Sequence, residues 1–123
     1  MEWKINYNEA KKTVIAVIEG FITVEEDIQM GIEAVNEARK NNCTKFFIDY
    51  TNSHIGDDIY DIFEVMTNLD KLGLNKTDRL AFVIKHDIDK FYLAETFAYN
   101  RGWEKLKYFQ NAEDAWQWLE AAK

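Results

Sequence analysis

Histidine and carboxylate side chains gather just after two apolar runs of the chain. His54, followed by Asp57 and Asp58, comes after the first run, and His86 comes after the second. Imidazole and carboxylate groups transfer protons near neutral pH and bind transition metals, so these residues could form an acid–base pair or a mixed metal site. Their spacing matches no specific metal motif, and histidines beside helix-capping aspartates are more often solvated. We therefore predict a polar site here with no catalytic residue, no metal and no cofactor.

The elements that position these residues follow from the hydrophobic periodicity. Two alternating, β-branched segments predict an antiparallel N-terminal hairpin. Two unbroken apolar runs predict strands that are buried on both faces, and apolar residues three or four apart predict helices. The predicted strands are 3–8, 13–20, 44–50, 79–85 and 104–109, and the predicted helices lie within 24–40, 57–74, 87–103 and 111–122.

Strands that alternate with helices predict parallel pairing through right-handed crossovers. The predicted fold class is α/β: a single, mostly parallel five-stranded sheet with an N-terminal β-hairpin and four helices, in the order ββαβαβαβα. A chain of 123 residues is long enough for one core, so we predict one domain over residues 1–123. The carboxyl ends of parallel strands usually carry the ligand site. We therefore expect one polar site at this edge, formed by Asp49, Thr51, His54, Asp57, Asp58 and His86.

Composition and charge exclude several classes of function. The formal net charge of −7 disfavours nucleic acid and anionic membrane surfaces as partners. No apolar run approaches the roughly 20 residues that span a bilayer, so we expect no membrane insertion. Cys43 is the single cysteine and the N-terminus lacks the pattern of a signal peptide, which predicts a cytoplasmic protein. We expect Cys43 to be an inert, half-buried thiol.

The stretch 87–103 is apolar on more than one helical face. Its small residues form one stripe, whereas Tyr92, Tyr99 and Trp103 fall on a second and Leu93 with Phe97 on a third. One interpretation is a single wide core face with tyrosine hydroxyls that reach solvent. The other is a dimer interface or the wall of an apolar pocket, which would use Tyr92, Phe97, Tyr99 and Trp103.

Three segments carry a family resemblance. The opening of the first helix, "IEGFITVEED", the strand end "FFIDYTNS" and the closing "NRGWEKLKYFQNAEDAWQWL" resemble the small STAS-like domains related to SpoIIAA, which have the anti-sigma-factor-antagonist fold. Within that group the chain is more similar to the stand-alone STAS/CRAL-TRIO-like proteins. The resemblance implies regulatory contacts with protein partners, and the CRAL-TRIO side implies an apolar or lipid-like ligand.

The resemblance also implies a phosphorylation site. The antagonists carry an Asp-Ser-Ser-Gly-Leu-type motif, and the matching stretch here makes Thr51 or Ser53 the candidate hydroxyl. A phosphate at a helix N-terminus is normally favourable, but Asp57 and Asp58 already occupy that terminus and would repel it. The alternative interpretation is that Ser53 or Asp57 caps the helix, and we favour capping by Ser53.

Two functional hypotheses follow from different classes. The first is a non-enzymatic regulatory domain that binds protein partners and self-associates as a homodimer. The second is a carrier or sensor of an apolar, lipid-like small molecule, held in a pocket beside the third predicted helix.

Overall fold

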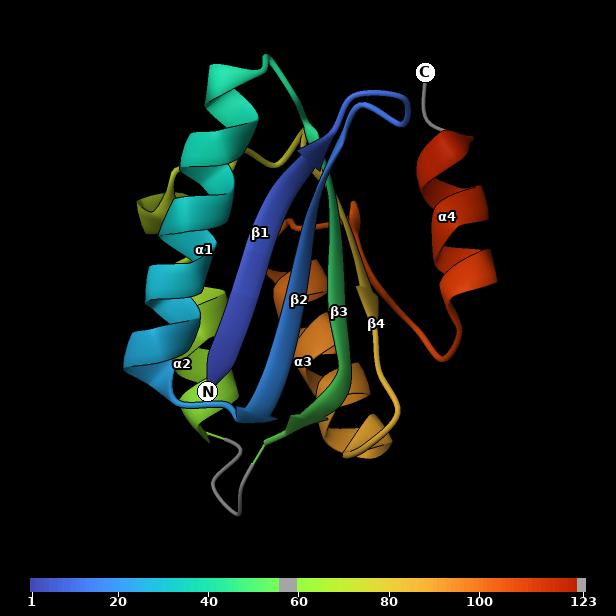
Figure 1. Cartoon of the computed structure of the whole chain (residues 1–123). Coiled ribbons are helices and arrows are strands. Elements are labelled where there is room, and N and C mark those ends of the chain that lie inside the picture. The colour runs from blue at the N-terminus through green and yellow to red at the C-terminus, as the bar shows by residue number, and fades with distance from the viewer. Residues whose placement is uncertain (56–59, 122–123) are drawn as a thin grey trace.

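The computed structural model of the chain describes residues 1–55 and 60–121 and contains one five-stranded sheet. The strands are β1 (Glu2–Asn8), β2 (Thr13–Phe21), β3 (Lys45–His54), β4 (Arg79–Val83) and β5 (Leu106–Phe109). The helices are α1 (Val24–Lys40), α2 (Tyr60–Thr67), α3 (Ile88–Asn100) and α4 (Ala112–Glu120), with a short 3-10 helix, η1 (Asp70–Leu72). Strand β1 is antiparallel to β2, and β2 to β5 are parallel. The predicted fold class and layout are therefore confirmed (Figure 1).

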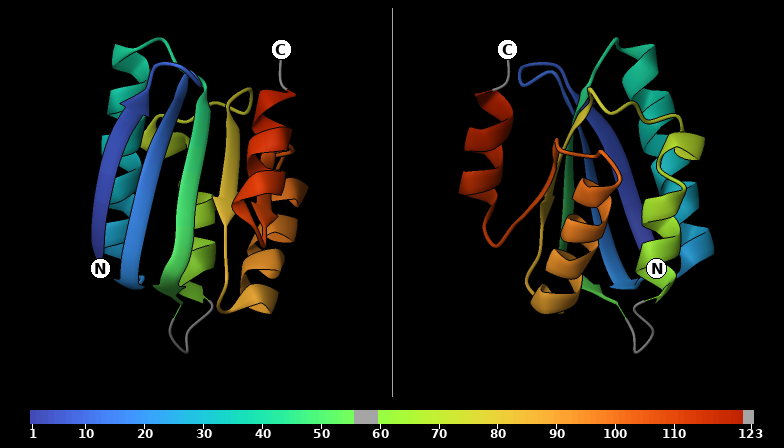
Figure 2. Two further views of the ribbon diagram at one scale, coloured as in Figure 1. Left: turned by 45° about the vertical axis from the view of Figure 1, so that its right-hand side comes forward. Right: turned by 180° about the vertical axis from the view of Figure 1, so that it is seen from behind.

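The sheet is wound in one direction only. Its strand order is β1-β2-β3-β4-β5, so each of the three helical crossovers moves one strand further the same way. Because crossovers are right-handed, three steps in one direction place α1, α2 and α3 on the same face of the sheet. Among the helices of the described residues, α4 alone lies on the opposite face, where it covers β4, β5 and part of β3 and leaves β1 and most of β2 open (Figure 2).

Strand β3 is the central strand and is buried on both faces, as its unbroken apolar run predicted. Phe46, Ile48 and Tyr50 belong to the large core under α1, α2 and α3. Phe47 points the other way and stacks on Trp116 of α4, with ring centroids 4.2 Å apart. Two cores of unequal size thus share one strand.

The helix boundaries follow the capping signals in the sequence. The side chain of Thr23 accepts a hydrogen bond from the backbone N–H of Glu26, and Asn111 caps α4 in the same way. The predicted second helix, however, is divided: α2 ends at Thr67, and η1 follows before Gly73 adopts a left-handed conformation with φ 98°. Of its two predicted N-terminal caps, Ser53 and Asp57, the second lies outside the described residues.

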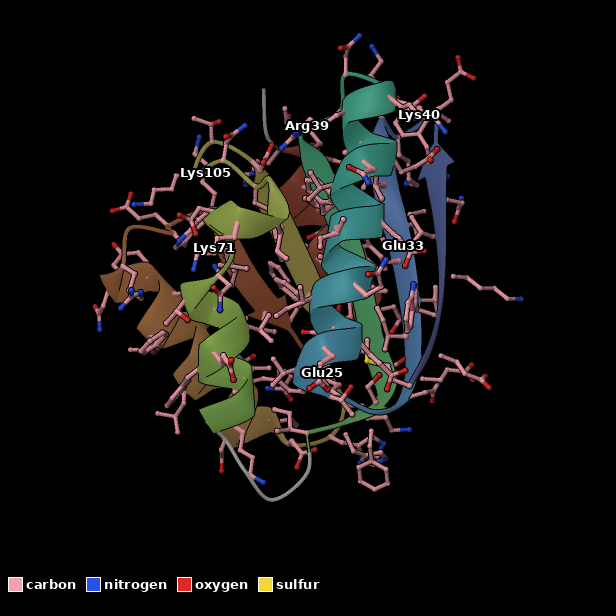
Figure 3. All side chains as sticks on the ribbon, turned by 90° about the vertical axis from the view of Figure 1, so that its left-hand side faces the viewer. Glu25, Glu33, Arg39, Lys40, Lys71 and Lys105 are labelled. Atoms are coloured by element: carbon pink, nitrogen blue, oxygen red, sulfur yellow. The ribbon has the colours of Figure 1, made fainter. Side chains whose placement is uncertain are left out.

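The C-terminal end of α1 is tied to the loop that enters β4. The guanidinium of Arg39 donates to both carboxylate oxygens of Asp78, at 3.3 and 2.7 Å, and to the carbonyl oxygens of Cys43 and Gly73. Asp78 is 1% exposed, and its burial is tolerated because Arg39 and the Asn75 N–H satisfy its oxygens. Figure 3 places Arg39 at this end of α1.

One expectation about a single residue is corrected. Cys43 is fully buried rather than half-buried, at 4% exposure, with its Sγ near the carbonyl oxygens of Lys12 and Lys45. Trp116 and Trp118 are both partly buried and both pack against the smaller core. They can do so because α4 lies over two strands: Trp116 contacts β3, and Trp118 contacts Phe109 of β5.

Replacing Phe47 by alanine tests the central position of β3. Loss of a fully packed phenylalanine should lower the free energy of unfolding by about 3–5 kcal/mol. Phe21→Ala is the matched control, because Phe21 lies in the neighbouring strand but is 67% exposed, and it should cost less than about 1 kcal/mol. Urea denaturation of both variants gives the comparison, and equal losses would contradict the placement.

Candidate functional site

The two histidines do meet at the carboxyl edge of the sheet. His54 is the last residue of β3, and its ring stacks on that of His86, with centroids 4.3 Å apart and planes at 28°. Phe21 at the end of β2 packs on His54 at 5.7 Å, and it is exposed. The carboxylate of Asp87 accepts a hydrogen bond from the Ile55 N–H, which ties the end of β3 to the start of α3.

Two other residues of the predicted edge site, Asp49 and Thr51, lie elsewhere. Asp49 and Thr51 lie on the sheet face opposite α1, α2 and α3, and Asp57 and Asp58 lie outside the described residues. Within residues 1–55 and 60–121 no three His, Cys, Asp or Glu side chains are placed to hold a metal ion. The strand order also contains no reversal among the parallel strands, which is the feature that opens a ligand crevice in doubly wound sheets.

The structure corrects the interpretation of Ser53 as a helix cap. Ser53 lies inside β3, which extends four residues further than predicted, and its Oγ donates to the carbonyl oxygen of Ile18 at 2.9 Å. Its exposure is 0%, so a kinase cannot reach it in this fold. The Thr51 hydroxyl is half-buried and donates to Asp49 Oδ1 at 2.7 Å, which places a carboxylate beside any phosphate added there.

The four aromatic residues proposed for an interface or pocket do not share one surface. Tyr99 is 57% exposed on α3, and Tyr92 is half-buried on the same helix. Phe97 stacks on Phe63 of α2 at 4.7 Å and so joins two helices. Trp103 is 6% exposed and belongs to the large core, because the chain leaves the helix after Asn100 and turns inward. The predicted stripe is thus divided between surface and core.

Open depressions beside α3 are lined by Tyr92 and, separately, by Tyr99. A cavity with a mostly apolar wall lies instead between α1, α2, η1 and the sheet. Its volume is about 40 Å³. None of Tyr92, Phe97, Tyr99 and Trp103 lines it. Its wall is hydrocarbon for the most part, with side chains such as Met30, Val35, Ile48, Met66 and Leu72, but Asp27, Tyr50 and Tyr108 also line it.

These three polar residues come from three different elements and form a cluster inside the apolar core. Asp27 in the first turn of α1 is 4% exposed, and its Oδ1 accepts a hydrogen bond from the Tyr50 hydroxyl of β3 at 2.6 Å. The Tyr108 hydroxyl of β5 is buried, and no described protein atom hydrogen-bonds to it. A carboxyl group and a phenol in such a place cost stability unless they have partners, so this cluster calls for an explanation.

Burial dominates the ionisation of this cluster. It raises the pKa of Asp27 to about 6, although the hydrogen bond from Tyr50 acts in the opposite direction. Burial, together with the charge of Asp27, also raises the pKa of Tyr50 well above its usual 10. Burial, Asp27 and Glu95 do the same for the pKa of Tyr108. The two tyrosines therefore stay protonated, and Asp27 is the group that titrates near neutral pH.

The residue type alone does not reveal this cluster, because an acid in the first turn of a helix, such as Asp27 in α1, is also explained by the helix dipole. A signal was present in the spacing. Asp27 lies three residues before Met30 and seven before Ala34, which puts it on the buried stripe of α1. Tyr50 likewise alternates with Phe46 and Ile48 on the helix-covered face of β3.

Comparisons with known proteins add no identity: no protein-family model matches the chain, and the search of curated proteins finds no similar sequence. In the described part of the chain, no helix combines the length and apolarity needed to cross a bilayer.

The buried carboxyl group gives a prediction for pH. Its pKa is about 6 in the folded chain and 3.8 in the usual exposed state, so ionisation opposes folding. The stabilising contribution of the protonated group is complete below pH 3.8 and is lost as the pH rises through 6. The free energy of unfolding of the wild type, minus that of Asp27→Asn, should fall by about 2.5 kcal/mol between pH 4 and pH 8.

Urea denaturation across this pH range measures the difference. All other carboxylates titrate in both proteins and therefore cancel. Asp114→Asn is the matched control, because Asp114 is exposed in the first turn of α4. The free energy of unfolding of the wild type, minus that of Asp114→Asn, should stay nearly constant over this pH range. A constant difference for Asp27→Asn as well would refute the assignment.

Proposed function

We propose that this protein is a non-enzymatic interaction domain that pairs with a second copy of itself through the open part of its sheet. The observation that carries the proposal is the half-covered face left by the one-directional winding (Figure 2). We call this surface the open strip. It consists of the residues of β1, β2 and β3 that point away from α1, α2 and α3 and are not packed against the core under α4: Glu2, Lys4, Asn6, Val17, Glu19, Asp49 and Thr51.

The centre of the open strip has a self-complementary order of side chains. Lys4, Val17 and Asp49 are paired in register across β1, β2 and β3, so they form one row perpendicular to the strands. Val17 is 38% exposed, and neither charged residue has an ion-pair partner among the described residues. Lys4 and Asp49 are two strands apart, about 10 Å between their backbones, and they form no ion pair with each other in the described chain.

A two-fold axis parallel to the strands, placed above Val17 and between two stacked sheets, would pair these charges between two copies. Rotation about this axis lays the row of one copy over the row of the other with its two ends exchanged. Lys4 of each copy then faces Asp49 of its partner, and the two Val17 side chains meet at the centre. Such reciprocal contacts are what an isologous dimer interface requires.

The position of α4 is compatible with this arrangement. The helix lies over β4 and β5, beyond the Asp49 end of the row. In the dimer each α4 would lie beside the exposed edge of the partner's β1, which protects an edge strand that is otherwise free to pair. The strip is only three strands wide, which is small for a stable interface, so we expect a concentration-dependent dimer.

The STAS-like resemblance is part of the same proposal. The order of elements in the structure is the one that the resemblance implies, which supports a regulatory role through protein contacts. The alternative of a lipid-like ligand has less support. The core cavity has a volume of about 40 Å³, well below the roughly 150 Å³ of a cavity that binds benzene, and the depressions lined by Tyr92 and by Tyr99 are open to solvent.

Charge reversal at the ends of the row tests the proposed dimer. Lys4→Glu or Asp49→Lys alone should weaken association by about tenfold or more, because each dimer then contains two like-charge contacts. The double variant Lys4→Glu/Asp49→Lys should recover the association, since both pairs are restored with opposite sign. Sedimentation velocity over a range of concentrations measures the dissociation constant, and circular dichroism confirms that each variant is folded.

Lys71→Glu is the matched control for the change in net charge. Lys71 is exposed in η1 on the helix-covered side of the molecule, remote from the open strip (Figure 3). The dimer of the Lys71→Glu variant should have the same dissociation constant as the wild-type dimer. A wild type that stays monomeric at high micromolar concentration, or a Lys4→Glu variant that behaves like Lys71→Glu, would exclude the open strip as the interface.

A further inference from the structure

We propose that the core cavity beside Asp27 is a binding site for one small hydroxyl-bearing molecule, which accepts a hydrogen bond from Tyr108 and donates one to the Asp27 carboxyl group. This site is independent of the open strip, because the cavity lies on the opposite side of the sheet, under α1 and α2. The proposal rests on the arrangement of the polar groups and on the size of the cavity.

Tyr108 supplies a hydrogen-bond donor that the described protein atoms leave without an acceptor. Its hydroxyl is buried in the wall of the cavity and is 2% exposed as a residue. The ring cannot turn to another partner, because it packs between Phe82 at 4.6 Å and Phe91 at 5.3 Å. The backbone N–H of Tyr108 is also held, by Glu95 Oε1 at 2.6 Å. A phenol fixed in this way needs an acceptor inside the cavity.

Asp27 supplies the complementary acceptor. Tyr50 donates to Oδ1, but a carboxylate can accept several hydrogen bonds. A molecule that reaches both Tyr108 and Asp27 must therefore accept at one position and donate at another. A hydroxyl group does both with a single oxygen atom. A carboxylate or phosphate would meet Asp27 without a donor, and no Lys, Arg or His lines the cavity to compensate an anion.

The size of the cavity limits what can carry this hydroxyl group. A volume of about 40 Å³ is about three to four times the 10–15 Å³ that one water molecule needs. The remaining wall is hydrocarbon, which favours a small apolar group beside the hydroxyl. Two sources fit this chemistry: an ordered water molecule, or an alcohol with very few carbon atoms such as methanol.

The variant Tyr108→Phe tests whether the Tyr108 hydroxyl donates a hydrogen bond to a guest molecule or has no partner. If a guest accepts the hydrogen bond, the variant loses that bond and its melting temperature falls below that of the wild type. If the hydroxyl is unpaired, its removal relieves a desolvated group, and the melting temperature stays the same or rises. Tyr92→Phe is the matched control, because its hydroxyl is on the surface of α3 and does not line the cavity. A melting temperature of Tyr108→Phe at or above that of the wild type overturns the proposal.

A high-resolution crystal structure of the wild type then locates the guest. We expect electron density within hydrogen-bond distance of both Tyr108 Oη and the Asp27 carboxyl group, and no such density in Tyr108→Phe. A wild-type cavity without density overturns the proposal. Titration with methanol distinguishes the two sources: a rise in the melting temperature of the wild type but not of Tyr108→Phe identifies the alcohol, and density without such a rise identifies water.

Discussion

The handedness of the crossovers is the constraint on which the rest of this structure depends. Each of the three βαβ units must be right-handed, and each moves one strand in the same direction. All three crossover helices consequently lie on one face, and the opposite face has only α4 to cover it. The two cores differ in size for this reason, and β3 is the strand that must satisfy both.

The same constraint explains why the two faces of the sheet suit different roles. Under α1, α2 and α3 the packing is deep enough to hold a cavity and to isolate a carboxyl group from solvent. On the other face α4 is too short to shield β1 and β2, so charged residues and Val17 stay accessible there. A buried site and a docking surface can therefore exist on one small sheet without sharing residues.

The polar cluster is the part of the core that local rules do not explain. The first turn of a helix favours a negative charge, yet desolvation outweighs this for Asp27 and raises its pKa. The hydrogen bond from Tyr50 offsets only part of the cost. An apolar residue at this position would avoid that cost. The presence of Asp27 beside a cavity thus indicates a role other than stability.

The sequence by itself determined the order of elements, the fold class, the capping of α1 and α4 and the double burial of β3, because periodicity and capping are local properties of the chain. It also brought His54 and His86 to one edge, since parallel strands end on the same side. Only the tertiary structure decided that Ser53 bonds to Ile18, that Trp103 turns into the core and that Asp27, Tyr50 and Tyr108 converge. These outcomes depend on contacts between residues distant in the chain, and neither spacing nor residue type encodes which distant side chain will be the partner.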